Sequence, residues 1–247
     1  MKNRYFIVVV FLLAAFSCRE SAYRAVKGDY TQKGIDSSVK EDSGLNAWLT
    51  SYRDSLDGIV STVLIKSSKV HTKGLPESPL GNLLADVLLE QSSNRLQQVD
   101  FALLNNGGIR APLPQGAVTV GHVMEVLPFM NYVVILELSG ETVKELLDHW
   151  AAKGGTAVSG VHFQIVNEKA ENIEVNSKPL VLSQKYKLAT IDYLADGGDG
   201  CAFLKNTLVL HRTQWLLMDL YIEAFKEMNQ KGLVINTSTD GRVTREP

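Results

Sequence analysis

The sequence has few cysteines and almost no excess of charge of either sign. Two cysteines occur among 247 residues, and the formal net charge is −2. Lysines and arginines are scattered, so the chain lacks the basic surface that nucleic-acid binding needs, and we expect no nucleic-acid partner. An apolar content of 45% is ordinary for a globular protein. The length suits one large domain or two small ones.

A hydrophobic run of transmembrane length is also missing. The apolar segment at residues 5–16 is too short for a comfortable membrane span. Lys2 and Arg4 precede it and small residues follow, which is typical of a secretory signal. Residues 15–18, Ala-Phe-Ser-Cys, resemble a bacterial lipobox, which predicts that Cys18 is the lipidated first residue of the mature chain. The alternative is an ordinary signal peptide followed by a chance cysteine.

These features divide the chain into three predicted parts. Residues 1–17 form a lipoprotein signal peptide, residues 18–42 a polar tether, and residues 43–247 a folded domain. We therefore expect a lipid-anchored protein of the bacterial cell envelope, facing the periplasm or the surface. Once Cys18 carries lipid, Cys201 has no partner, so no intrachain disulfide is expected.

Hydrophobic periodicity predicts a domain in which helices and strands interleave. Residues 45–59 repeat apolar side chains at helical spacing, and Asp42 or Ser43 could cap this amphipathic helix. Interleaved elements of both kinds favour an α/β (α+β) fold, a single layered domain of mixed β-sheets with packed helices. The predicted helices are 45–59, 80–91, 120–126, 140–152 and 213–230, and the predicted strands are 61–68, 100–104, 132–138, 161–166, 171–175 and 187–192.

Two glycine-rich loops follow predicted strands. The first, Asn-Asn-Gly-Gly-Ile-Arg at residues 105–110, combines amides with adjacent glycines that let the backbone approach a ligand closely. Arg110 adds a planar fork of donors suited to an anion. The second loop, Asp-Gly-Gly-Asp-Gly, occupies residues 196–200. Two such loops on one scaffold indicate a small-molecule site.

Patterns that hold catalytic metal ions are missing. Two-metal hydrolysis needs Asp, His and Asn ligands that hold the ions about 3.5–4 Å apart. The sequence contains no Asp-x-His, Gly-Asn-His-Glu or Gly-His-x-His motif, and its five histidines are isolated. A P-loop and a Ser-His-Asp arrangement are also missing, and Cys201 has no nearby base in sequence. We therefore expect no catalytic residue, metal site or cofactor in this chain.

Four motifs in order give the chain a family resemblance. They are Leu-Gly-Asn-Leu-Leu-Ala-Asp (80–86), Asn-Asn-Gly-Gly-Ile-Arg (105–110), Val-Leu-Pro-Phe-Met-Asn (126–131) and Tyr-Leu-Ala-Asp-Gly-Gly-Asp-Gly (193–200). Together they resemble the C-terminal, substrate-binding domain of the 5′-nucleotidase and UDP-sugar hydrolase family, over roughly residues 45–240. The resemblance implies that domain's fold, here without the metallophosphoesterase domain that carries two metal ions in the family.

The resemblance also implies a nucleotide site. Arg110 matches an arginine that contacts the sugar or α-phosphate region, and Asp199 matches an acid that holds ribose hydroxyls. Phe129 and Tyr193 match two rings that sandwich the base, and such stacking contributes about 1–3 kcal/mol per base. The remaining expected contacts are Asn106, Gly108, Asn131 and Gly160.

Taken one at a time, these residues could also have purely structural roles. One feature of the family is also missing from this sequence. Phe129 alone suits core packing, Asp199 alone suits a turn cap, and Arg110 alone suits a surface ion pair. The family commonly has an arginine shortly before the first motif, where this chain has Leu-Pro-Glu-Ser-Pro at residues 75–79. Lys73 is the candidate substitute for the phosphate-facing half of the site.

Three functions remain open from the sequence. The first is the substrate-recognition half of a split nucleotide phosphohydrolase, whose divalent metals sit on a separate metallophosphatase chain. The helix at 45–59 favours it, because this helix resembles the one that joins the two domains in intact family members. The second is a solitary nucleotide- or nucleoside-binding scavenging protein. The third is an intrinsically active 5′-nucleotidase-type hydrolase, which the missing ligand motifs argue against.

Overall fold

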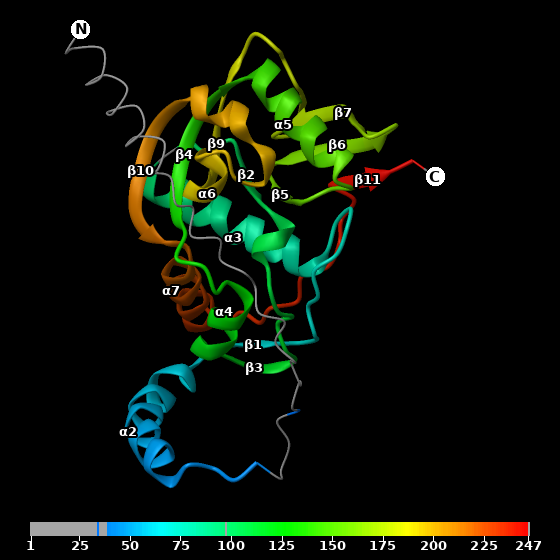
Figure 1. Ribbon diagram of the computed structural model, residues 1–247. Coiled ribbons are helices and arrows are strands. Elements are labelled where there is room, and N and C mark those ends of the chain that lie inside the picture. The colour runs from blue at the N-terminus through cyan, green and yellow to red at the C-terminus, as the bar shows by residue number, and fades with distance from the viewer. Residues whose placement is uncertain (1–33, 35–38, 97, 247) are drawn as a thin grey trace, which may run out of the picture. The chain divides into compact units, whose positions relative to one another are not determined.

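The computed structural model describes residue 34 and residues 39–96 and 98–246 (Figure 1). Cys18, the predicted signal peptide and most of the predicted tether lie outside the described residues. None of the helices within the described ranges is long and apolar enough to cross a membrane.

The first described helix, α2 (Ser43–Val60), begins at a side-chain cap. One carboxylate oxygen of Asp42 accepts hydrogen bonds from the backbone N–H groups of Gly44 and Leu45, at 2.9 and 3.0 Å. Of the two predicted capping residues, Asp42 is therefore the one that satisfies the free N–H groups. The apolar side chains of the predicted helix face are each more than half exposed: Leu45, Trp48, Tyr52, Leu56 and Ile59.

A five-stranded mixed sheet forms the centre of the domain. Its strand order is β10 (Leu208–Leu216), β4 (Tyr132–Ser139), β9 (Lys185–Ile191), β2 (Phe101–Leu104) and β5 (Ala157–Ser159). Strands β2 and β9 are parallel, and the other neighbours are antiparallel. All four residues of β2 are buried, as expected for a strand covered on both faces.

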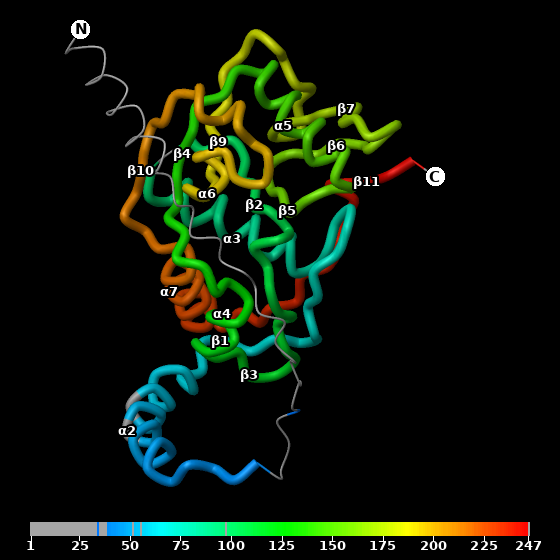
Figure 2. Tube along the Cα trace, viewed as in Figure 1, coloured from blue at the N-terminus to red at the C-terminus, as the bar shows by residue number. Residues whose placement is uncertain are grey.

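Helices pack on this sheet and on each other (Figure 1). Helix α3 (Pro79–Leu96) contacts β2, β5 and α7 (Leu217–Gln230), and α5 (Gly140–Ala152) contacts β4 and β7 (Lys169–Val175). Helix α4 (Val120–Val126) begins at a reciprocal cap, in which the Thr119 hydroxyl accepts from the His122 N–H and His122 Nδ1 accepts from the Thr119 N–H. The short helix α6 (Asp192–Ala195) follows β9 directly and contacts β4 (Figure 2).

Two smaller sheets complete the described fold. One has the order β11 (Val243–Arg245), β6 (Val161–Val166), β7 and β8 (Lys178–Pro179), with β11 parallel to β6. The other pairs β1 (Val63–Ser67) with β3 (Gly116–Thr119). The predicted fold class, a layered domain of mixed sheets and packed helices, is confirmed.

The segment at residues 235–245 connects both of these smaller sheets. Ile235 exchanges backbone hydrogen bonds with β1 and the residue after it, through the Lys66 carbonyl and the Ser68 N–H at 2.9 Å each. Further along, the buried Arg242 forms ion pairs with Asp86 of α3 and with Asp240. Arg242 also donates to the Val158 carbonyl of β5 at 2.9 Å, which fixes the segment just before it joins β6.

One predicted helix is wrong in its first part. The sequence predicted a helix over 213–230, but β10 continues to Leu216 and α7 begins at Leu217. Pairing with β4 decides the structure here, because Thr213 Oγ1 donates to the Val133 carbonyl at 2.8 Å and Leu216 pairs with Tyr132. Helical spacing of apolar residues is a local signal, and long-range strand pairing overrides it.

Candidate functional site

The topology of the central sheet brings the two glycine loops together. Strands β2 and β9 are adjacent and parallel, so the loops that follow them leave the same edge of the sheet. The loop after β2 forms a 3₁₀ turn, η1 (Asn106–Gly108), and the segment after β9 forms α6 and the turn η2 (Gly198–Gly200). Strand β4 begins at this edge too, because Val133 pairs with Ile191. Residues 127–131 therefore reach the same place from α4.

These three segments enclose a cavity of about 340 Å³. Six of the residues predicted from the sequence line it: Gly108, Arg110, Phe129, Asn131, Tyr193 and Asp199. Asn105 and Gly107 complete the lining.

Two predicted site residues do not line the cavity. Gly160 lies between β5 and β6 with φ +76°, and a Cβ there would come within 2.5 Å of the Asp100 carbonyl oxygen. A tight backbone crossing therefore accounts for this glycine. Asn106 begins the η1 turn, and its carbonyl accepts from the Ile109 N–H at 3.3 Å. The neighbouring Asn105 is buried and lines the cavity.

Asp199 is the most firmly held residue of the cavity. Its Oδ2 accepts from Asn105 Nδ2 at 2.7 Å, and its Oδ1 accepts from the Tyr193 hydroxyl at 2.9 Å. Its backbone carbonyl accepts from His149 Nε2 at 2.9 Å and from Lys153 Nζ at 2.5 Å. His149 lies within α5, and Lys153 directly follows that helix. Sequence reasoning missed these two donors, because they lie about fifty positions away in the chain.

The aromatic residues of the cavity present their rings to solvent. Phe129 is 48% exposed and Tyr193 45% exposed, which leaves ring surface free for a planar ligand. The Arg110 guanidinium carbon lies 6.0 Å from the centroid of the Phe129 ring. Arg110 Nη1 donates to the Gly107 carbonyl at 3.2 Å, so the guanidinium stays close to the glycine loop.

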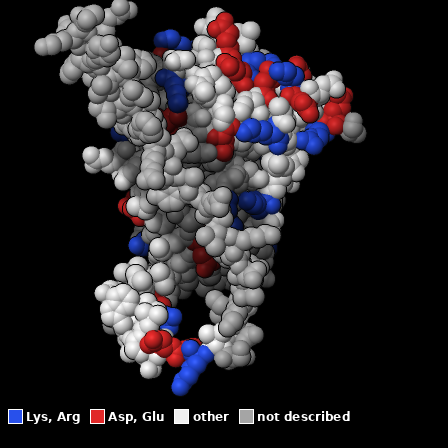
Figure 3. Space-filling view, in the orientation of Figure 1, with Lys and Arg blue, Asp and Glu red and all other residues white. Residues whose placement is uncertain are grey.

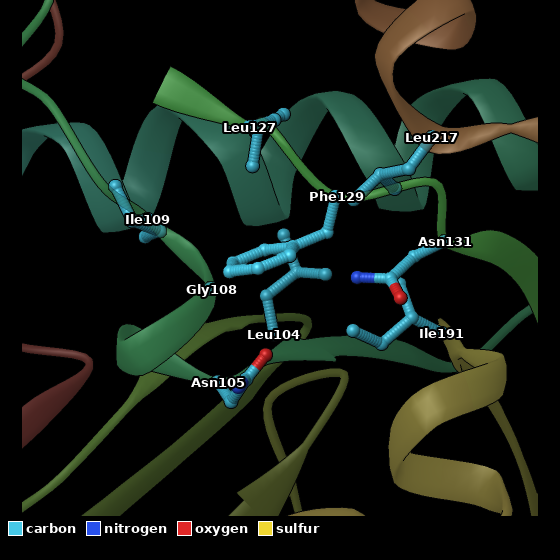
Figure 4. A pocket seen from close by; sticks show the side chains of 9 residues that line it. All are labelled: Leu104, Asn105, Gly108, Ile109, Leu127, Phe129, Asn131, Ile191 and Leu217. Carbon is cyan, nitrogen blue, oxygen red and sulfur yellow. The ribbon is translucent and has the colours of Figure 1, made fainter. Parts of the chain in front are cut away.

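An apolar floor lies beside the Phe129 ring. The Leu104, Ile109, Leu127, Ile191 and Leu217 side chains form it. Figure 4 shows the Phe129 ring above Leu104, with the Asn131 side chain pointing toward the ring. A mostly apolar recess with a few oriented polar groups is the usual construction of a small-molecule pocket.

Lys73 reaches the glycine loop from outside the cavity. Its ammonium donates to the Ile109 carbonyl at 2.6 Å and lies 3.5 Å from the Asn106 carbonyl. Lys73, the candidate substitute for the family arginine, therefore contacts the backbone of the loop that carries Arg110.

Metal-ligating side chains and the Cys201 thiol are the other reactive groups in the part of the chain that the structure describes. Within those residues, no three His, Cys, Asp or Glu side chains gather as metal ligands. Burial raises the pKa of the Cys201 thiol to about 11, so this thiol is protonated at neutral pH. On the face shown in Figure 3, basic and acidic side chains are interspersed.

An aromatic-walled cavity with a fixed carboxylate and a nearby guanidinium has the features of a small-molecule-binding domain. The sequence profile described as "5′-nucleotidase, C-terminal domain" matches residues 58–206. The chain belongs to this family.

Curated relatives and solved structures agree with this assignment. The chain is 26% identical to a 5′-nucleotidase of Mus musculus, in an alignment that covers 85% of this chain and 41% of the mouse protein. It is 27% identical to a cell wall protein of Listeria monocytogenes, over 83% of this chain and 30% of that protein. A 5′-nucleotidase precursor from Thermus thermophilus superposes with a TM-score of 0.72 at 28% identity, covering 84% of this chain and 44% of the other. The chain thus spans less than half of each of these proteins.

Proposed function

We propose that the chain recognises a nucleoside or nucleotide and supplies substrate recognition to a phosphohydrolase whose metal-bearing catalytic domain lies on a partner chain. The cavity carries this proposal, because exposed rings, a carboxylate and a guanidinium all border one volume of about 340 Å³.

Each part of a nucleotide has a matching group in this cavity. A base can stack on Phe129 or Tyr193, with about 1–3 kcal/mol per base. The Asp199 carboxylate can accept hydrogen bonds from ribose hydroxyls, and Arg110 can pair with a phosphate through two donors. Binding energy from the base and sugar would then position the phosphate for attack by a nucleophile held elsewhere.

Two observations support a catalytic partner. Relatives named 5′-nucleotidase are more than twice as long as the region that this chain matches. Helix α2 also exposes an apolar face that includes Leu56 and Ile59, at 56% and 61% exposure. Exposed apolar surface of this kind marks interaction sites. A metallophosphatase chain packed on this face would complete the enzyme.

The proposed location is the bacterial cell envelope, through a lipid on Cys18. The relatives named as a precursor and as a cell wall protein support a position outside the cytoplasm. Metabolic labelling with a radioactive fatty acid tests the anchor. We expect label on the wild-type protein and none on Cys18→Ser, and an unlabelled wild-type protein would contradict the lipid.

Calorimetric titration of the purified protein with adenosine and AMP tests recognition. We expect binding that Phe129→Ala and Asp199→Ala each weaken at least about tenfold, since each removes a stacking or charged hydrogen-bonding partner. Met130→Ala and Asp196→Ala are matched controls, because these neighbours are exposed and do not line the cavity. Failure of the wild-type protein to bind either compound would refute the proposal.

Phosphate release tests the division of labour. The purified chain with Mn²⁺ or Zn²⁺ should release no phosphate from AMP, and sustained release by pure protein would show that catalysis is intrinsic. Chemical crosslinking in cells should capture a metallophosphatase, and Leu56→Glu with Ile59→Glu should abolish that crosslink. Asp54→Lys, an exposed change on the same helix, should leave the crosslink intact.

A further inference from the structure

The hydroxyl of Tyr193 does more than border the cavity. It donates a hydrogen bond to Asp199 Oδ1 at 2.9 Å. It also accepts a hydrogen bond from the Asp199 backbone N–H, at 3.2 Å. One phenol therefore holds the same aspartate at its side chain and at its backbone. A phenylalanine here would keep an aromatic wall and lose both contacts.

These contacts hold Asp199 in a conformation that few residues adopt. Its φ is +52°, in the left-handed region that is uncommon for residues other than glycine, asparagine and aspartate. Such a conformation persists where neighbouring groups determine it. Four side chains from three parts of the fold donate to Asp199 and hold it in this conformation. They are Asn105 after β2, His149 in α5, Lys153 just after α5 and Tyr193 in α6.

The hydrogen bonds also decide what the carboxylate can still accept. Each carboxylate oxygen offers about two lone-pair positions. Asn105 uses one on Oδ2 and Tyr193 uses one on Oδ1, so each oxygen retains capacity for one further donor. Two donors on neighbouring carbon atoms, as in a vicinal diol, match two adjacent acceptor oxygens.

The Tyr193 ring is itself fixed against the backbone of the second glycine loop. A Cβ on Gly198 would lie 2.5 Å from the ring carbon that bears the hydroxyl, and 2.5 Å from the Tyr193 carbonyl oxygen. The ring therefore rests directly on the residue before Asp199. The ring contacts Gly198 and its hydroxyl contacts the carboxylate, so the fold fixes all three relative to one another.

We propose that the Tyr193 hydroxyl is a positioning group: it holds the Asp199 carboxylate beside the ring, so that a ligand stacked on the ring presents its vicinal diol to both carboxylate oxygens. This inference rests on the proposed function and assigns the Tyr193 hydroxyl a role in the same site. Tyr193 acts on the diol through Asp199, as a positioning residue.

Titration of wild-type and Tyr193→Phe proteins with adenosine and 2′,3′-dideoxyadenosine tests the coupling. The variant should bind adenosine about fivefold more weakly, the effect of losing one hydrogen bond, and bind the dideoxy compound unchanged. Tyr132→Phe removes the hydroxyl of an exposed tyrosine outside the cavity lining and should alter neither affinity. Equal weakening of both ligands by Tyr193→Phe, or no weakening of either, would overturn the coupling.

Hydrogen exchange in the ligand-free protein gives a second readout. Tyr193→Phe removes the acceptor of the Asp199 N–H, so exchange of that amide should accelerate about tenfold or more, while amides in β4 should not change. Unchanged exchange would show that the hydroxyl does not hold Asp199. If the wild-type protein binds neither nucleoside, the proposed function and the diol contact both fail, and the exchange result alone decides whether Tyr193 positions Asp199.

Discussion

The two ends of the cavity are built in different ways. At the carboxylate end, formed by Asn105, Tyr193 and Asp199, the aspartate takes part in five hydrogen bonds to three separate parts of the fold. At the guanidinium end, formed by Arg110 and Phe129, the exposed arginine side chain donates to a single loop carbonyl at 3.2 Å. Many hydrogen bonds therefore hold the carboxylate end, and a single one holds the guanidinium end.

Because of this difference, the conformational entropy lost on ligand binding is smaller at the carboxylate end than at the guanidinium end. A fixed carboxylate loses little conformational freedom when a ligand arrives, so its hydrogen bonds contribute fully to affinity. An exposed arginine must give up about 1–2 kcal/mol of side-chain entropy when it is ordered. The fixed end suits the constant part of a ligand family, and the adjustable end suits a part that varies, such as the phosphate.

The largest expected contrast comes from adding one methyl group to each glycine loop at the carboxylate end. Gly198→Ala places a Cβ 2.5 Å from the Tyr193 ring and carbonyl, whereas a Cβ on Gly107 lies 3.7 Å from Asn105 Nδ2 and 3.9 Å from Asp199 Oδ2. We expect Gly198→Ala to lower the free energy of unfolding by about 1–3 kcal/mol, the usual effect of overpacking. Gly107→Ala should change it by less than about 0.5 kcal/mol. Urea denaturation measures both, and equal effects would show that the Tyr193 ring is not held tightly against Gly198.

Removing the arginine should affect affinity and leave stability intact. We expect Arg110→Ala to weaken AMP binding by about 1.5–3 kcal/mol, as for a hydrogen bond to a charged group, with a smaller change for adenosine. Calorimetric titration measures both affinities. Arg212→Ala is a suitable control, because Arg212 is an exposed arginine paired with Asp196 and lies outside the cavity lining. Equal losses for AMP and adenosine would place Arg110 against the sugar.

Lys73→Met should have a smaller effect at the same end. The lysine supports the glycine loop through the Ile109 carbonyl, and one such contact contributes about 0.5–1.5 kcal/mol. We expect a few-fold loss of AMP affinity, measured by calorimetry, with Lys66→Met on β1 as the control. A loss as large as that of Arg110→Ala would mean that Lys73 contacts the phosphate directly.

The smallest expected effect is a dependence of the free energy of unfolding on pH. It sets the pH range in which the variants at the two ends can be compared at equal stability. His71 is fully buried, and burial lowers its pKa below the ordinary value. As pH falls below about 6.5, the unfolded chain takes up a proton that the folded chain resists, so stability is present above this pH and declines below it. Urea denaturation at pH 7.5 and 5.5 should show the decline, and His71→Gln should reduce it. A slope unchanged by His71→Gln would assign the decline to other groups.

The sequence predicted well those features that depend on local patterns. The helices at 120–126 and 140–152 appear with the predicted bounds. The two glycine loops predicted as a small-molecule site do border one cavity, because their strands are neighbours in the sheet.

Features set by long-range contacts could not be read from the sequence. Neither spacing nor composition shows that β10 extends to Leu216 through pairing with β4. The choice between Asn105 and Asn106 depends on how the η1 turn rotates its side chains, and two adjacent asparagines look alike in the sequence. His149 stood isolated in the sequence, yet the fold brings it to 2.9 Å from the Asp199 carbonyl.

The segment at residues 235–245 has a consequence for how the protein is made. Strand β1 meets Ile235 near one end of this segment, and β6 meets Val243 near the other. Translation runs from the N-terminus, so neither partner strand can complete its pairing until this segment has left the ribosome. The nascent chain must therefore keep two open sheet edges apart from its neighbours on the polysome.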